Sequence, residues 1–92
     1  MADTIKSILL LARRDHAEAM RVAAGLTIFG HQVRLVFMDR PVADTPENAE
    51  QAELLELAEI APETTVQAED LPQLDRTRLA EALMSTDVVM SF

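Results

Sequence analysis

Cysteine is absent from this chain of 92 residues, which also has no tryptophan or tyrosine, only three phenylalanines and only two glycines. Without cysteine there are no disulfides, no thiolate metal ligands and no cysteine nucleophile or persulfide carrier. The two isolated glycines, Gly25 and Gly30, do not form the glycine-rich loop that cradles phosphates in many nucleotide-binding proteins. These absences exclude several common classes of site before any motif is considered.

Long hydrophobic runs are also missing. The longest, Ile8 to Ala12, is far shorter than the roughly 20 residues that a membrane-spanning helix needs. The opening residues, Met1 to Lys6, have neither the basic start nor the apolar segment of a signal peptide. We therefore expect a cytoplasmic protein that does not enter the membrane.

Basic residues are scarce in the second half of the chain. The net charge is -8, but residues 1–40 carry six bases and four acids, whereas residues 41–92 carry two bases and twelve acids. An acidic protein repels phosphate backbones, and 3% aromatic residues offer no platform on which bases stack. We expect no binding of nucleic acid. The charge asymmetry either orients subunits or is simply a solvated acidic face, which is the plainer interpretation.

The segment from Ile8 to Met38 has the pattern of a strand, a helix and a second strand. Residues 8–12 and 33–38 are apolar runs without alternation, and a helical segment from Ala17 to Phe29 separates them. Such runs are typical of a parallel sheet that is covered on both faces. The segment therefore predicts a right-handed βαβ unit.

Local signals mark both ends of this first helix. Asp15, followed three residues later by Glu18, indicates a cap in which Asp15 accepts from a first-turn amide and Glu18 reaches back. Gly30 supplies the left-handed residue that ends many helices, and His31 is expected to hydrogen-bond the last carbonyls.

The rest of the chain continues the alternation of helices and strands. Thr45 as cap and Pro46 as first residue start a second helix, which Pro62 stops. We expect its apolar side to contain Leu54, Leu55, Leu57 and Ala58. The remaining predicted elements are a short strand at 64–68, a helix at about 75–85 that buries Leu79, Ala82 and Leu83, and a final strand at 88–92.

This order predicts a single α/β domain over residues 1–92. We expect a small three-layer sandwich with a four-stranded, mainly parallel sheet and a flavodoxin-like outline. The strand at 8–12 carries no charge and is expected to be internal. The strand at 33–38 contains Arg34 and is expected nearer an edge.

The first helix is more apolar than one sheet face requires. Glu18, Arg21 and Gly25 are its main interruptions, so its polar stripe is narrow. We expect part of the remaining surface to be covered by another subunit, and the predicted interface contains Met20, Ala24, Ile28 and Phe29.

Candidate ligand-binding residues follow the predicted strands, because ligands of open α/β sheets bind beyond the carboxyl ends of the strands, near helix N-termini. Arg13 and Arg14 beside a helix start are suited to an anion, although surface solvation explains them more simply. His16 is expected to be exposed. Glu69 and Asp70, after the third predicted strand, are expected to be solvated acids. The full predicted ligand or anion site is Arg13, Arg14, Asp15, His16, Asp39 and Arg40.

No catalytic constellation is visible. The two histidines, His16 and His31, are fifteen positions apart on different elements, which is no recognised metal spacing. The serines Ser7, Ser85 and Ser91 lack the context of a nucleophile elbow. We expect no metal, no cofactor and, on balance, no enzymatic activity.

Three segments carry a family resemblance. They are Ile8 to Ala12 with its alanine-rich helix, Leu26 to Phe37 with a Gly-His-x-Val turn, and Thr86 to Phe92, which is similar to an Ala-Asp-x-Val-x-x-Phe ending. In these segments the chain resembles the DsrE-like family of small sulfur-relay proteins, which includes the Tus and Dsr subunits. The resemblance covers most of the chain but does not extend to residues 40–63.

The resemblance implies a DsrE-like fold and assembly with other subunits. Active members carry sulfur as a persulfide on a cysteine in a loop, and the equivalent neighbourhood here, Gln67 to Leu74, holds Ala68, Glu69 and Asp70 instead. The resemblance therefore implies a non-catalytic, oligomerising or partner-binding module linked to sulfur metabolism. It implies a homo-oligomer, as dimer, trimer or hexamer, or a hetero-oligomer with related subunits. The alternative is a small-anion or nucleotide-binding protein that uses Arg13, Arg14 and His16.

Overall fold

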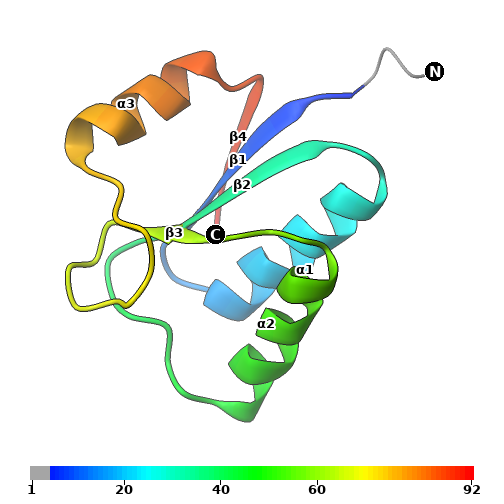
Figure 1. The fold of residues 1–92 in the computed structure, drawn as a ribbon, viewed down its shortest axis with the longest axis vertical. Coiled ribbons are helices and arrows are strands. Elements are labelled where there is room, and N and C mark those ends of the chain that lie inside the picture. Colours follow the sequence, from blue (N-terminus) through cyan, green and yellow to red (C-terminus); the bar gives the residue numbers. More distant parts are fainter. Residues whose placement is uncertain (1–4) are drawn as a thin grey trace.

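A four-stranded, all-parallel sheet lies between two layers of helices. The computed structural model describes residues 5–92, so the first four residues of the polar lead-in lie outside it. The strand order is β3-β2-β1-β4. Figure 1 shows α1 and α2 together on one face of the sheet and α3 on the other, which confirms the predicted fold class. The elements are β1 (Ser7–Ala12), α1 (His16–Ile28), β2 (Gln32–Phe37), α2 (Pro46–Leu57), β3 (Glu63–Thr64), α3 (Arg76–Ser85) and β4 (Val88–Ser91).

The central strand β1 contributes buried side chains to the core on both faces of the sheet. Ile8 and Leu10 pack with buried residues of α1 and α2, whereas Leu9 packs with Ala82 of α3. Successive side chains of a strand point to opposite faces, so a strand covered on both faces must be apolar throughout. The unbroken apolar run therefore placed β1 correctly, between β2 and β4.

Strand β2 has neighbours on both sides, but one of them is very short. It pairs with β1 along its whole length and with β3 only at Val36 and Phe37. In the stretch without a β3 partner, Arg34 makes a two-pronged ion pair with Glu63, with N···O distances of 2.6 and 3.0 Å. This pair holds the pKa of Arg34 above its ordinary value. The prediction that this strand lies nearer an edge than β1 is therefore wrong, because both strands are internal in the sheet order. Only the first half of β2 lacks a partner on the β3 side.

Strand β3 is shorter than predicted, and it does not extend to residue 68. The Thr64 hydroxyl accepts a hydrogen bond from the Val66 amide at 3.0 Å and donates to the Phe37 carbonyl at 3.3 Å. A threonine that bonds the amide two residues ahead forms a turn. The chain therefore leaves the sheet directly after Thr64, which is completely buried.

Both ends of α1 are set by local hydrogen bonds. The Asp15 carboxylate accepts from the Glu18 amide at 3.1 Å, as predicted, but Glu18 pairs with Arg21 instead of reaching back. At the other end Gly30 has φ +89°. The Gly30 amide bonds the Thr27 carbonyl and the His31 amide bonds the Leu26 carbonyl, which is a Schellman motif.

The expected role of the His31 side chain is wrong in detail. The backbone amide of His31, not its ring, caps the last turn of α1. The ring nitrogen Nδ1 accepts from the backbone amide of Lys6 at 3.1 Å. The imidazole therefore ties the turn after α1 to the start of β1.

Part of the apolar circumference of α1 is buried within the subunit. Met20 and Ala24, predicted at a subunit interface, are 1% and 6% exposed, and Met20 packs in one core cluster with strand residues and with Leu55 of α2. Ile28 and Phe29, at the far end of the helix, are 80% and 81% exposed. The predicted interface therefore retains only its last two residues as accessible surface.

Helices α2 and α3 bury fewer apolar side chains than their sequences predict. On α2 only Leu55 is buried, while Leu54 and Leu57 are 40% and 81% exposed. On α3 Ala82 is buried, and Leu83 is 40% exposed. Helix α2 packs mainly against α1 and not against the sheet. No helix within residues 5–92 is long and apolar enough to cross a membrane.

The last strand is anchored at both of its ends. The Asp87 carboxylate accepts hydrogen bonds from the Ser7 amide and hydroxyl at 2.9 and 3.2 Å, and these bonds hold the pKa of Asp87 below its ordinary value. At the other end the Phe92 carbonyl accepts from the amides of Arg13 and Arg14 at 2.8 and 2.7 Å. The end of the chain thereby fixes the loop that leads from β1 into α1.

Candidate functional site

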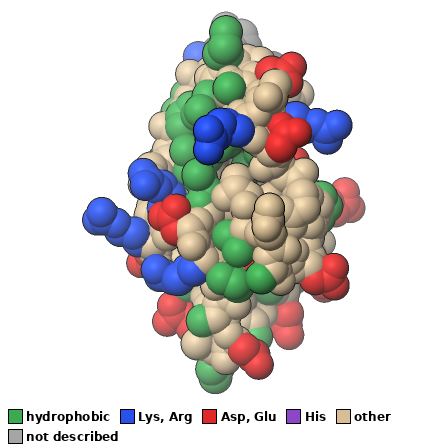
Figure 2. Space-filling view, turned by 90° about the vertical axis from the view of Figure 1, so that its left-hand side faces the viewer, with side chains coloured by type: hydrophobic (Ala, Val, Ile, Leu, Met, Phe, Trp, Pro, Cys, Tyr) green, Lys and Arg blue, Asp and Glu red, His purple; other side chains and the backbone are tan. Residues whose placement is uncertain are grey.

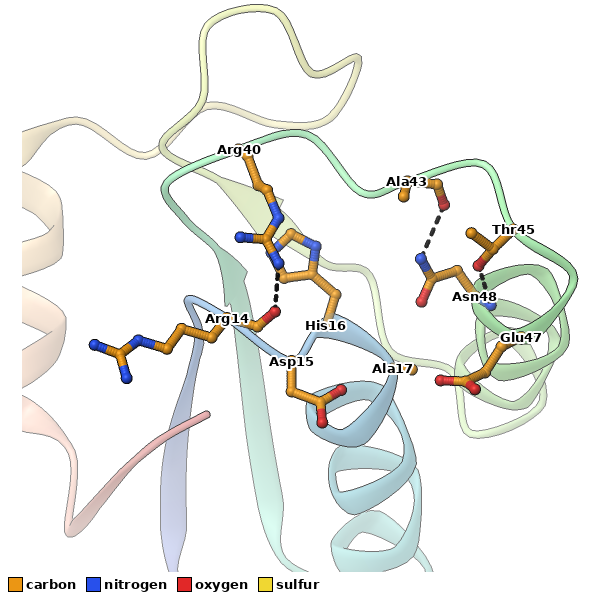
Figure 3. Close-up of a pocket in the computed structure, with 9 residues that line it drawn as sticks. All are labelled: Arg14, Asp15, His16, Ala17, Arg40, Ala43, Thr45, Glu47 and Asn48. Atoms are coloured by element: carbon orange, nitrogen blue, oxygen red, sulfur yellow. Dashed lines mark hydrogen bonds between the residues drawn. The ribbon is translucent and has the colours of Figure 1, made fainter.

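A pocket of about 310 Å³ opens beyond the carboxyl end of the sheet, between the N-termini of α1 and α2. Ligands of open α/β sheets bind at this carboxyl end of the strands, although the point where the strand order reverses lies between β1 and β4 and not at this pocket. The structure brings together four of the six predicted site residues there (Figure 3). The lining residues are Arg14, Asp15, His16, Ala17, Arg40, Ala43, Thr45, Glu47 and Asn48.

The other two predicted residues lie outside this lining. Arg13 and Asp39 form an exposed ion pair with an N···O distance of 3.5 Å. Exposed pairs of this kind contribute little to stability, because water screens them. This ion pair joins the loop after β1 to the loop after β2. Its two residues lie beside the pocket and do not line it.

His16 is buried, so the prediction that it is exposed is wrong. Its side chain is 5% exposed, and its ring meets the Phe37 ring edge-on, with centroids 5.3 Å apart and an interplanar angle of 62°. The sequence places His16 at a helix start, where most side chains are solvated. Here the chain after β2 folds back over that helix start and covers the ring.

The Nε2 atom of His16 is buried and has no hydrogen-bond partner among the residues that the structure describes. A buried polar atom without a partner costs about 1–3 kcal/mol, so native proteins contain few of them. His16 and Arg40 both line the pocket, and the His16 ring and the Arg40 guanidinium overlap in the view of Figure 3. Oε1 of Gln51 is the other buried side-chain atom without a partner among the described residues, but only His16 lines this pocket.

A strained turn brings Arg40 to this position. Asp39 has φ +71°, and the Arg40 amide bonds the Met38 carbonyl at 2.8 Å, which is the geometry of a γ-turn. Non-glycine residues rarely adopt a positive φ, and such strain gathers at functional sites. After the turn, Nη2 of Arg40 donates to the Arg14 carbonyl at 2.6 Å. The guanidinium is thereby held over the start of α1, with its other N–H groups available.

The helix start itself contributes backbone donors. The Glu18 amide is occupied by the Asp15 cap and the Ala19 amide by the Asp15 carbonyl. The amides of His16 and Ala17 belong to the first turn, which has no intrahelical acceptors. Together with the helix dipole they favour a negative ligand group at this end of α1.

The far wall of the pocket comes from the start of α2. Asn48 is fixed there twice, since its amide donates to the Thr45 hydroxyl at 3.1 Å and its side chain donates to the Ala43 carbonyl at 2.9 Å. Sequence reasoning missed this wall. The same rule about strand ends and helix starts, applied to β2 and α2, would have found Thr45 and Asn48.

The charges around the pocket are mixed. Arg40 covers it, whereas Figure 3 shows the Arg14 side chain extending away from the α2 wall. Asp15 and Glu47 add two carboxylates to the lining. Such a site favours a small ligand that reaches the guanidinium and the imidazole without approaching both acids.

Metal chemistry has no support from side-chain geometry. Within residues 5–92 no three histidine, aspartate or glutamate side chains gather in an arrangement that holds a metal ion.

Comparison with known proteins adds no relative. No family model, no curated protein and no solved structure matches this chain.

Proposed function

We propose that this protein binds a small oxyanion of the phosphate or sulfate type in the pocket between α1 and α2. The observation that carries the proposal is the buried Nε2 of His16, which lacks a partner beside an arginine and a helix N-terminus. In the bound state, an anion oxygen accepts from Nε2–H, and other oxygens accept from Arg40 and the first-turn amides of α1. Charge-assisted hydrogen bonds of this kind are about twice as strong as neutral ones.

Nε2 is buried in the present conformation, so binding requires a neighbouring side chain to move, and we propose that this side chain is Arg40. The guanidinium is exposed and is held by one hydrogen bond to the Arg14 carbonyl. Exchanging that bond for an anion leaves the backbone in place. The protein's net charge of -8 and the carboxylates of Asp15 and Glu47 oppose binding, so affinity is modest and the site selects a compact anion.

Inorganic phosphate is expected to raise the thermal midpoint more than chloride does at equal ionic strength. A ligand present at about 100 times its Kd adds roughly 2.7 kcal/mol to the stability of the native state. Arg40→Gln is expected to weaken phosphate binding about tenfold or more, because it removes the charge that faces the anion.

Arg76→Gln is the matched control. It removes the same charge at the start of α3, in the opposite layer of the molecule, and is expected to leave the phosphate response unchanged. An equal phosphate shift in both variants, or a wild-type shift no larger than that of chloride, contradicts the proposal.

A second candidate function is the cysteine-less DsrE-like module that the sequence resemblance implies. The observation in its favour is the pair Ile28 and Phe29, two large apolar side chains that are about four-fifths exposed at the end of α1. Exposed large apolar side chains that form a continuous patch are typical of interaction surfaces. In this proposal the chain self-associates or joins related subunits in the cytoplasm.

A second exposed apolar surface lies at α3, and it is an alternative site of self-association. In Figure 2 green side chains gather in the upper half of the view, where α3 lies. The exposed large apolar side chains of this part of the chain include Leu83 and Met84 of α3 and Val89 of β4. Any measurement of assembly must therefore separate the end of α1 from the α3 surface.

Light scattering after size exclusion, at high micromolar concentration, is expected to show an oligomer. Phe29→Ser is expected to shift the mass toward the monomer, because it removes an apolar anchor from the interface. Met84→Ser, at the α3 surface, is expected to leave the mass unchanged. A strict monomer, or a loss of mass only with Met84→Ser, contradicts the assembly proposal.

A further inference from the structure

A second pocket, of about 400 Å³, lies on the other side of the segment after β2. Val42 lines this pocket, whereas its neighbours Arg40 and Ala43 line the first one. The second pocket is bounded by α2, the end of β2 and the loops on either side of β3. Its lining consists of Met20, Phe37, Val42, Ala52, Leu55, Glu56, Ile60, Pro62, Glu69, Asp70 and Leu71.

The floor and walls of this pocket are apolar. Met20, Phe37 and Leu55 form the floor and belong to the main core, with 1–3% of their surface exposed. Ile60 and Leu71 are only partly buried and pack against that core from the sides. Pockets of a few hundred Å³ with this kind of lining are typical of sites for small organic ligands.

The polar residues at this pocket are all acidic. Glu56 comes from α2, while Glu69 and Asp70 come from the loop after β3, and no lysine or arginine is among the lining residues. The Glu69 side chain is fixed, because its Oε1 accepts from the Val42 amide at 2.9 Å. The half of the chain that supplies these acids has ten more acids than bases. An apolar pocket whose charged rim has one sign favours a ligand with an apolar body and the opposite charge.

We infer that this pocket binds a small amphipathic amine, that is, a primary ammonium group on an alkyl or aryl body. The apolar body replaces water against Met20, Phe37 and Leu55, and the ammonium donates to the carboxylates of Glu56 and Asp70. A primary ammonium suits this rim better than a quaternary one, because carboxylates need N–H donors. Quaternary groups favour cages of several aromatic rings, whereas Phe37 is the single aromatic residue in this lining.

Three probes with the same body test the role of charge. They are 4-phenylbutylamine, 4-phenylbutanol and 4-phenylbutyrate, whose binding is followed by amide chemical shifts of Val42, Ile60 and Leu71. The amine is expected to bind about tenfold more tightly than the alcohol, and the carboxylate more weakly than both. The preference for the amine is expected to fall when the salt concentration rises from about 0.05 M to about 0.5 M, because the rim is partly exposed.

Two variants test the two parts of the site separately. The double variant Glu56→Gln with Asp70→Asn is expected to bring the amine and the alcohol to about equal affinity, since only the charge preference is lost. Ala52→Phe is expected to weaken all three probes by filling the pocket. Glu53→Gln, which removes a charge from α2 outside the pocket, is the control and is expected to change nothing.

Three outcomes overturn the inference. Equal affinity of the amine and the alcohol in the wild-type protein shows that the acidic rim does not select the ligand. Shifts that spread over the whole molecule, or that persist in Ala52→Phe, show that the amine binds elsewhere on the acidic surface. Shifts at Val42 and Leu71 that change on dilution without any probe show that a second copy of the chain covers the pocket.

Discussion

Leu10→Ala is expected to lower the free energy of unfolding by about 3–5 kcal/mol, which is the upper range for a leucine in a close-packed core. Leu10 is completely buried in the middle of β1, where it pairs in register with Leu35 and Met90. The strands on both sides and the helices above it prevent the surrounding structure from collapsing into the cavity. A domain of this size has only about 5–14 kcal/mol of stability, so the loss is a large fraction of the whole.

Urea titration measures this effect as a fall in the denaturation midpoint. Leu57→Ala is the matched control, because it removes the same atoms from a side chain that is 81% exposed. The control is expected to stay within about 0.5 kcal/mol of the wild-type protein. Similar losses in the two variants contradict the position of β1 at the centre of the sheet.

His16→Phe is expected to raise the free energy of unfolding by about 1–2 kcal/mol in buffer without phosphate, and to abolish stabilisation by phosphate. The phenyl ring keeps the edge-on contact with Phe37 and removes the buried nitrogen that lacks a partner. Greater stability together with lost binding is the behaviour of a residue kept for its ligand rather than for the fold.

His31→Phe is the control for this second prediction. The ring of His31 accepts a hydrogen bond from Lys6, so the same substitution there is expected to lower the free energy of unfolding, by about 0.5–1.5 kcal/mol. Guanidinium titrations with and without phosphate compare the variants. A loss of stability in both His16→Phe and the smaller His16→Leu contradicts the assignment of Nε2 as an unpaired group.

Features that depend on neighbours in the sequence were predictable. Asp15, Thr45 and Asp75 each accept from the amide three residues ahead, and each begins its helix as the residue types indicate. The central position of β1 was predictable as well, because only a strand covered on both faces is apolar at every position. These signals are local or purely hydrophobic, so a single sequence contains them.

Features that depend on distant segments were not predictable. An apolar side of α1 is explained equally well by a second helix or by a second subunit, and the structure shows Met20 packed in a core cluster that includes Leu55 of α2. The burial of His16 depends on how the chain turns at Asp39, and no sequence pattern marks that turn. The candidate residues were therefore predicted at the edge of the sheet where the pocket opens, but the His16 side chain was expected to be exposed and is buried.

The two bonds that the Phe92 carbonyl makes to the amides of Arg13 and Arg14 affect the order of events during folding. The unit from β1 to β2 closes a short stretch of chain, whereas β4 joins β1 across a separation of 80 residues. Contacts between remote segments cost more chain entropy and form late. Strand β4 docks late, and Phe92, which directly follows it, fixes the loop before His16. We therefore expect the ability to bind the anion to appear only in the slowest phase of folding. A species in which only the βαβ unit from β1 to β2 has formed should contain α1 and have no affinity for the anion.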